Sequence, residues 1–432
     1  MTTFIKNITY ILILILILIS CSSSISKIKT VKQTKSTEKT TTLAADSKQD
    51  SVQPKINERH PIKTGADNYH VYLPLLQGKK IAVVTNQSGV VLTENNTENL
   101  ADKKTQTHLV DFLLAQKISI CKIFAPEHGF RGTADAGEQI VDGMDSTTGL
   151  PIISLYGSNK KPTLGQLKGI DIMVFDLQDV GARFYTYISS LHYIMEACAE
   201  NNIQLIILDR PNPNGSIVDG PILEKEFTSF VGMHPIPVLH GMTIGEYSQM
   251  INGEHWLKDG ISCKLTVIPC SYYNRKMQYS LPVKPSPNLP NDKSINLYPS
   301  LCFFEGTNVS AGRGTEKQFQ IYGSPYLPQS NFSFVPKPNI GAQDPVYNGV
   351  TCFGEDLSNE HRLRQLELKW LIKTYAITTN KAKFFNPFFT KLAGTRKLQQ
   401  QIEDGKSETD IRESWETGLK KFKKMRTKYL IY

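Results

Sequence analysis

The stretch GIDIMVFD, residues 169–176, is an almost unbroken apolar run that ends in an aspartate. Four similar short runs lie in the same part of the chain, and all are rich in large apolar residues. They are KKIAVVTN (79–86), SICKIFA (119–125), PIISLYG (151–157) and IQLIILDR (203–210). Runs of this kind are typical of strands buried on both faces of a sheet.

Helical patterns alternate with these runs. The segment THLVDFLLAQK (107–117) has helical spacing, and YTYISSLHYIMEACAENN (185–202) predicts an amphipathic helix. Thr243 and Glu246 have the spacing of a capping box, which predicts another helix start. The alternation predicts an α/β fold, with a Rossmann-like, mostly parallel sheet domain and a smaller C-terminal α/β domain.

Composition divides the 432 residues into four parts. Residues 1–20 predict a lipoprotein signal peptide, and residues 21–67, rich in Ser, Thr and Lys, predict a flexible tether. Residues 68–265 hold the predicted strands and form the Rossmann-like domain. Residues 266–432 change in texture, end in an amphipathic pattern, and predict a smaller domain that contributes to the cleft.

The N-terminal apolar run ends in Leu18-Ile19-Ser20-Cys21, which resembles the lipobox of bacterial lipoproteins. The resemblance implies cleavage before Cys21 and acylation of its thiol; an uncleaved signal anchor is the alternative. Either reading takes the body out of the cytoplasm and attaches it to a membrane. We therefore expect a cell-envelope protein on the periplasmic or outer-membrane side.

Charge and motif content exclude several classes of protein. The net charge of +9 comes from scattered residues, and the basic cluster at 420–428 is typical of a solvated helix face, so no nucleic-acid partner is expected. Signatures of serine hydrolases, P-loop proteins and dinucleotide-binding proteins are absent. His128, His234 and His240 lack metal-ligand spacing. We expect no cofactor and no metal.

Polar loops follow the predicted strands, where parallel sheets bind ligands. The loop FAPEHGFRGTADAGE (124–138) has two glutamates, a histidine and an arginine on a glycine-rich backbone. The candidate substrate-binding residues from these loops and from later segments are Asn86, His128, Arg131, Asp176, Asp179, Arg183, Asp209, Arg210, Asn212, His240 and Arg313.

Glycosidic cleavage needs a carboxylic acid near the leaving oxygen and usually a second carboxylate. The candidate catalytic residues are Glu127, Glu138, Tyr185 and Glu305. Glu127 follows Pro126 at a strand end, where partial burial raises the pKa of a carboxyl toward that of a useful acid. Three arginines, Arg131, Arg183 and Arg313, offer planar forks for a substrate carboxylate.

Some of these residues have a structural alternative. For Glu127 and Glu138, the alternative is to hold their loop by hydrogen bonds to the backbone. Arg183 is equally suited to a buried ion pair with Asp176 or Asp179.

Eight segments together resemble the NamZ-type exo-β-N-acetylmuramidases. They are VTNQSGV, FAPEHGFRGTADAGE, TGLPIISLYG, DIMVFDLQDVGARFYTY, LDRPNPNGSIVDGPIL, PIPVLHGMTIGE, PSPNLP and FEGTNVSAGRGT, spread from about 79 to 326. The resemblance implies a glycoside hydrolase that releases N-acetylmuramic acid (MurNAc) from the non-reducing end of peptidoglycan fragments such as MurNAc–GlcNAc. It also implies a catalytic role for Glu127, the glutamate of the PEHG motif. Asn214 and Ser216 depart from the family pattern.

Two other functions stay open at this point. One is a metal-dependent hydrolase of cell-wall esters or amides that uses His128 and nearby aspartates. The other is a non-catalytic lipoprotein that binds cell-wall fragments. Sequence also leaves retaining and inverting mechanisms open, because the separation of the two carboxylates decides between them. It does not say which arginine meets the lactyl carboxylate of MurNAc.

Overall fold

The computed structural model describes residues 60–94, 104–127, 129–131 and 142–432. Residues Arg59–Tyr432 form one compact unit. Cys21, His128 and Glu138 lie outside the described residues, as do the predicted signal peptide and most of the predicted tether. Within the described part of the chain, no helix is both long enough and apolar enough to cross a membrane.

A seven-stranded sheet forms the centre of the fold, in the order β5-β6-β4-β1-β7-β8-β9. Its strands are β1 Lys80–Thr85, β4 Ser119–Ala125, β5 Gly143–Met144, β6 Pro151–Ser154, β7 Ile172–Asp176, β8 Gln204–Leu208 and β9 Leu265–Ile268. All neighbouring pairs are parallel except β5 with β6. The predicted mostly parallel α/β sheet is confirmed, and each of the five apolar runs forms one of its strands.

Both faces of this sheet are buried. Along β1, Ile81 and Val83 pack in one apolar cluster, whereas Ala82 and Val84 pack in another. The first cluster includes residues of α1 Tyr69–Leu76 and α2 Leu109–Ala115, and the second includes residues of α4 Tyr187–Glu200 and α5 Ile244–Gly253. Because successive side chains of a strand point to opposite faces, a continuous apolar run is required here.

Local signals set several element boundaries. The Thr243 side chain caps α5, and the Glu246 carboxylate accepts the reciprocal hydrogen bond from the Thr243 amide, so the predicted capping box is confirmed. A second box begins the short helix α3 Leu164–Leu167. The hairpin of β2 Val90–Glu94 and β3 Lys104–His108 and helix α1 have no counterpart in the sequence analysis.

The C-terminal part contains a three-stranded antiparallel sheet and six helices among the described residues. The strands, in the order β10-β12-β11, are β10 Ile321–Ser324, β12 Cys352–Asp356 and β11 Ser333–Phe334. The helices are α6 Asp292–Leu301, α7 Lys369–Ile377, α8 Phe388–Ala393, α9 Lys397–Glu403, α10 Glu408–Glu413 and α11 Glu416–Arg426. Short 3-10 turns occur at Lys225–Phe227, Lys258–Gly260, Cys302–Gly306, Lys381–Lys383 and Thr427–Tyr429.

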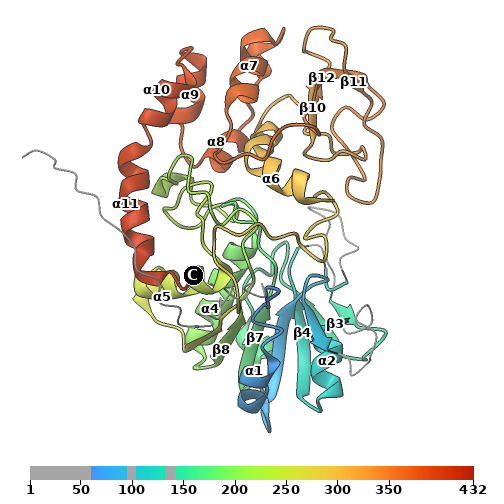
Figure 1. Ribbon diagram of the computed structural model, residues 1–432, viewed down its shortest axis with the longest axis vertical. Coiled ribbons are helices and arrows are strands. Elements are labelled where there is room, and N and C mark those ends of the chain that lie inside the picture. The colour runs from blue at the N-terminus through green and yellow to red at the C-terminus, as the bar shows by residue number, and fades with distance from the viewer. Residues whose placement is uncertain (1–59, 95–103, 128, 132–141) are drawn as a thin grey trace, which may run out of the picture. The chain divides into compact units, whose positions relative to one another are not determined.

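Figure 1 shows α6 and the small sheet at one end of this unit and the large sheet at the other. Helix α11 returns to the first part, where Arg426 Nη1 donates to the Gly241 carbonyl at 2.7 Å and Lys428 pairs with Glu254 at 3.0 Å. The smaller C-terminal region is therefore confirmed as part of the architecture, and the boundary at residues 265 and 266 stays a prediction.

Two buried histidines join α4 to α5 through a short hydrogen-bonded chain. His192 Nδ1 lies 3.0 Å from His234 Nε2, and His234 Nδ1 lies 2.8 Å from the Tyr247 hydroxyl. His234 also stacks on Trp256, with ring centroids 4.6 Å apart. Burial lowers the pKa of both histidines, although nearby Glu196 opposes the effect at His192.

We expect the fold to lose stability as pH falls below about 6.5, the ordinary histidine pKa. Below this pH the two histidines are protonated in the unfolded chain but stay neutral while they are buried in the fold. Each pH unit costs about 1.4 kcal/mol per histidine that stays neutral. Urea unfolding between pH 8 and 5 measures this slope. His234→Gln is expected to flatten the slope; an unchanged slope would contradict the assignment. Asp209, whose raised pKa acts in the opposite direction, is common to both proteins.

Candidate active site

A cavity of about 300 Å³ lies beyond the carboxyl ends of the strands. The loops after β4, β6 and β7 supply Glu127, Tyr156 and the segment 184–186. Residues from α6, α8, the 302–306 turn and nearby loops supply the rest of the lining, which includes Asn288, Tyr298, Cys302, Glu305 and Arg313. The position agrees with the rule that ligands bind at this edge of a parallel sheet.

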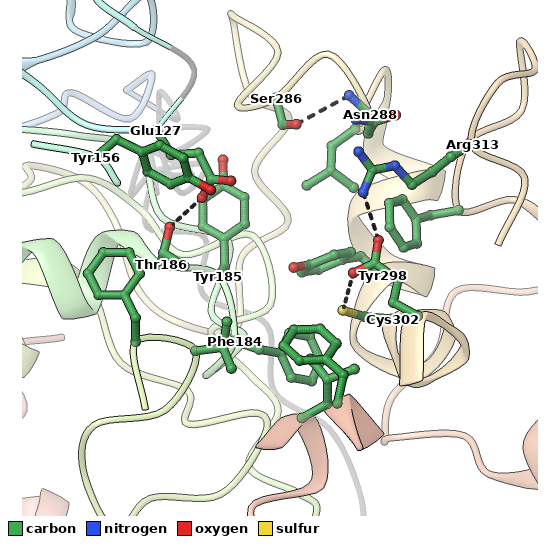
Figure 2. Close-up of a pocket in the computed structure, with 17 residues that line it drawn as sticks. Glu127, Tyr156, Phe184, Tyr185, Thr186, Ser286, Asn288, Tyr298, Cys302 and Arg313 are labelled. Atoms are coloured by element: carbon green, nitrogen blue, oxygen red, sulfur yellow. Dashed lines mark hydrogen bonds and ion pairs between the residues drawn. The ribbon is translucent and has the colours of Figure 1, made fainter. Parts of the chain in front are cut away.

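Glu127 is the acidic residue of the strand-end wall. Thr186 Oγ1 donates to its Oε2 at 2.8 Å. Burial and a hydrogen bond with the Glu127 carboxylate raise the pKa of Tyr156 to about 12, so the Tyr156 hydroxyl stays a donor. Figure 2 shows Glu127, Tyr156 and Thr186 on one wall and Arg313, Asn288 and Tyr298 on the facing wall. Two hydroxyls therefore orient a carboxyl that lines the cavity.

Glu305 and Arg313 form an ion pair in the lining. Arg313 Nη1 lies 3.0 Å from Glu305 Oε1, and both side chains are 27% exposed. Cys302 Sγ donates to Glu305 Oε2 at 3.7 Å, and Arg313 Nη2 donates to the Gly341 carbonyl at 3.3 Å. The structure thus brings the predicted residue Glu127 to the same cavity as two predicted residues from a distant part of the sequence, Glu305 and Arg313.

Tyr185 also lines the cavity, but its hydroxyl donates to the Pro285 carbonyl at 2.7 Å. Its ring packs edge-on against Tyr187, with centroids 4.8 Å apart. Burial raises the pKa of Tyr185 well above its usual range. The side chain is therefore a neutral, anchored part of the wall, which suits packing against a sugar better than proton transfer.

Asn86, Asp176 and Arg210 lie outside the cavity lining and support it from within. Asn86 Nδ2 donates to the Tyr187 hydroxyl at 2.6 Å. Arg210 contacts Asp176 through Nε at 2.6 Å and Nη2 at 2.9 Å, and Nη2 also donates to the Val90 carbonyl. Asp176 and Arg210 are buried and form an ion pair between β7 and the loop after β8, and their predicted substrate contacts stay predictions.

Asp179, Asn212 and His240 are likewise buried in the loops behind the cavity. Asp179 Oδ2 accepts from the Gly181 amide at 2.7 Å and lies 3.7 Å from His240 Nε2. Asn212 Nδ2 donates to the Met242 carbonyl at 2.9 Å. These contacts hold one loop against another, so these three side chains also support the site without lining it.

Arg183 has a structural role in this fold, and its predicted substrate contact stays a prediction. It is fully buried, and its guanidinium donates to the carbonyls of Pro221, Ile236, Leu392 and Ala393, each at 2.8 Å. Burial lowers its pKa to about 9. No partner among the described residues is an aspartate, so the proposed buried ion pair is not formed. Arg183 instead ties α8 to the loops of the large sheet.

Arg131 lies on the loop after β4 but does not line the cavity. Its guanidinium pairs with Asp145 at 2.9 Å and with Asp111 at 3.4 Å, and it lies over the Phe130 ring. Its neighbours His128 and Glu138 are outside the described residues, so their predicted roles stay predictions.

Asp209 is a buried acceptor for four donors, one of which is the Arg210 backbone amide at 3.0 Å. Thr243 Oγ1 and the Gly245 amide each donate at 2.7 Å, and the Tyr432 hydroxyl donates at 2.8 Å. Burial raises its pKa to about 6, although these donors oppose the shift. The Tyr432 hydroxyl also accepts from the Cys270 amide at 2.7 Å. Asp209 therefore links several segments through its hydrogen bonds, and its predicted substrate contact stays a prediction.

Tyr432→Phe is expected to lower the free energy of unfolding by about 1–3 kcal/mol, since it leaves the buried Cys270 amide without its acceptor and removes one of the two side-chain donors to Asp209 Oδ2. Thermal unfolding monitored by circular dichroism measures the loss. The matched control is Tyr429→Phe, which removes the hydroxyl that donates to the partly exposed Glu254 and should cost less than about 1 kcal/mol. Equal losses in the two variants would argue against a stabilising role for the buried Asp209 hydrogen bonds.

Several cavity residues were missed by sequence reasoning. They are Tyr156, Thr186, Phe230, Ser286, Asn288, Tyr298 and Cys302. Tyr156 lies at the end of the strand segment 151–157, and Thr186 lies in the loop that follows the strand segment 169–176, so the position of each was a usable signal. Tyr298 and Cys302 had none, because their helix and turn read as ordinary apolar sequence. Among the described residues, no group of three or more His, Cys, Asp or Glu side chains is placed to hold a metal ion.

Comparisons with known proteins show which family this chain resembles. The family models for the N-terminal and C-terminal parts of the exo-β-N-acetylmuramidase NamZ match residues 81–293 and 296–432. The peptidoglycan β-N-acetylmuramidase NamZ of Bacillus subtilis (strain 168) is 40% identical over 394 residues, which cover 86% of this chain and 91% of that protein.

Two crystal structures of DUF1343 family proteins from Bacteroides fragilis are also similar. One is 43% identical with a TM-score of 0.78, and the other is 27% identical with a TM-score of 0.69. Each comparison covers 86% of this chain and 99% of the other.

Proposed function

The chain belongs to the NamZ family of exo-β-N-acetylmuramidases, and from this premise we propose that it is a glycoside hydrolase that releases MurNAc from the non-reducing end of peptidoglycan fragments such as MurNAc–GlcNAc. One observation carries the proposal: a cavity at the carboxyl edge of the sheet has an oriented glutamate, Glu127, on one wall and the charged pair Glu305–Arg313 in its lining. Such fragments arise in cell-wall turnover and recycling.

Glu127 acts as the general acid in this proposal. Its carboxyl lines the cavity and is oriented by Thr186 and Tyr156, so that it donates a proton to the leaving glycosidic oxygen. Tyr298 and Phe230 supply aromatic faces around the sugar. Both Glu305 oxygens already have partners in Arg313 and Cys302, which favours a positioning role over direct catalysis.

The test compares two chromogenic substrates on the purified full-length chain. Hydrolysis of the β-MurNAc glycoside, without comparable hydrolysis of the β-GlcNAc glycoside, supports the proposal. Hydrolysis of neither compound, with calorimetric binding of MurNAc–GlcNAc, would instead identify a non-catalytic binding protein. Loss of hydrolysis after treatment with a chelator, restored by added metal, would favour the metal-dependent alternative.

We also propose that the chain is a lipoprotein of the cell envelope, anchored to the membrane on the periplasmic or outer-membrane side. The apolar run that ends at Cys21 supports this location, and so does a substrate found outside the inner membrane. Cys21→Ala should abolish incorporation of a labelled fatty acid and release the protein from the membrane fraction. If the Cys21→Ala protein still incorporated the labelled fatty acid, acylation at this thiol would be overturned.

A further inference from the structure

MurNAc differs from GlcNAc by a lactyl ether, which is a carboxylate at neutral pH. An enzyme that selects MurNAc therefore needs a cation near the bound sugar. Among the described residues that line the cavity, Arg313 is the only arginine, lysine or histidine. We propose that Arg313 recognises the lactyl carboxylate and determines the specificity for MurNAc. This inference rests on the proposed function.

Arg313 is held in place and still accessible. Glu305 contacts Nη1 at 3.0 Å, and the Gly341 carbonyl accepts from Nη2 at 3.3 Å. The side chain is 27% exposed, and a guanidinium has five N–H donors in a fixed plane. A partly exposed ion pair contributes about 0–1 kcal/mol, so sharing the guanidinium with a substrate carboxylate costs little.

The position of Arg313 also gives the direction of the lactyl group. Glu305, Arg313 and Phe388 line the 300 Å³ cavity and, on their other side, a neighbouring hollow of about 570 Å³. Arg313 thus lies where the two spaces meet, on the wall that faces Glu127 in Figure 2. The sugar ring occupies the smaller cavity beside Glu127, and its lactyl arm extends toward this junction.

The other two arginine forks are in the wrong places. Arg183 is fully buried and donates to four backbone carbonyls. Arg131 is engaged by Asp145 and Asp111 and does not line the cavity. Of the three forks that the sequence offered, only Arg313 can face a sugar that is in reach of Glu127.

The experiment compares three chromogenic glycosides: β-MurNAc, β-MurNAc with its lactyl carboxyl converted to a methyl amide, and β-GlcNAc. For Arg313→Gln we expect kcat/KM on β-MurNAc to fall about 10- to 100-fold, the loss of one charge-assisted contact. The wild type should lose a similar factor on the amide, whereas Arg313→Gln should treat acid and amide alike. Arg313→Lys keeps the charge but not the planar fork. Its preference for acid over amide should lie between those of the wild type and Arg313→Gln.

Two further variants sharpen the result. Arg364→Gln changes an exposed arginine away from the cavity and should preserve the preference for acid over amide. Arg131→Gln tests the rival fork. The proposal is overturned if Arg313→Gln keeps the wild-type preference, if it slows all three substrates equally, or if Arg131→Gln is the variant that loses the preference. Thermal unfolding of each variant separates these outcomes from loss of folding.

Failure of the proposed function gives a different pattern. In that case the wild type cleaves none of the three compounds. Isothermal titration calorimetry with free MurNAc, its lactyl amide and GlcNAc then tests Arg313 by binding alone. A wild-type preference for the acid that disappears in Arg313→Gln supports the assignment, and equal binding of acid and amide by the wild type overturns it.

Discussion

Glu127→Gln is expected to lower kcat for β-MurNAc hydrolysis by about 10²- to 10⁴-fold, because an amide cannot supply the proton that general acid catalysis requires. The change keeps the shape of the side chain. The Thr186 hydroxyl, which donates to Glu127 at 2.8 Å, can rotate to meet either amide atom. We therefore expect the thermal unfolding midpoint to stay close to that of the wild type.

Steady-state kinetics with a β-MurNAc glycoside measure the effect, with Glu226→Gln as the matched control. Glu226 is exposed in the 225–227 turn and away from the cavity, so its variant should keep wild-type kcat. A glycoside with a very acidic phenol leaving group needs little protonation and should show a smaller loss in Glu127→Gln. If Glu127→Gln kept the wild-type kcat on glycosides with less acidic leaving groups, the assignment of Glu127 as general acid would be contradicted.

Arg210→Met is expected to destabilise the fold by about 3–5 kcal/mol, because it leaves the fully buried Asp176 carboxylate without its partner. Burial alone would lower the pKa of Arg210, but the adjacent Asp176 raises it above its usual range, so the guanidinium stays charged in the fold. The Val90 carbonyl also loses a donor. The midpoint of urea unfolding measures the loss.

Two comparisons identify the cause of that loss. The double variant Asp176→Leu with Arg210→Met removes both charges and should recover most of the stability, since no lone charge is then buried. Lys420→Met breaks the exposed pair with Glu416 and should cost less than about 0.5 kcal/mol. A double variant as unstable as Arg210→Met would show that side-chain packing, and not the unpaired charge, dominates.

The large sheet was predictable because its cause is local. Five apolar runs each became a strand, and strands covered on both faces must be apolar at every position. The amphipathic pattern near the C-terminus was also predictable. It forms two helices, α10 and α11, and its apolar residues Ile411, Trp415 and Phe422 are buried. Helix α1 was missed because its sequence YHVYLPLL includes Pro74 and lacks a side-chain cap, so it has neither a clean period nor a start signal.

The site was only partly predictable. Glu127 follows a strand end, where the topology of parallel sheets places ligands, and that rule identified it correctly as a cavity residue. The same rule also selected Asp176, Asp209 and Arg210, which are buried beneath the cavity. Strand-end loops contain both cavity-lining residues and buried supporting residues. The residue type is the same in the two cases, so the sequence does not show whether a side chain faces solvent or packs against another loop.

Sequence by itself therefore determined the sheet, the order of its main elements, the family resemblance and the leading glutamate. Only the tertiary structure decided which arginine faces the cavity, that Arg183 ties α8 to the large sheet, and that Glu305 reaches the same cavity as Glu127. The physical reason is one of range. Periodicity and capping act over a few residues, whereas the exposure and partners of a charged side chain depend on segments that meet only after the chain has folded.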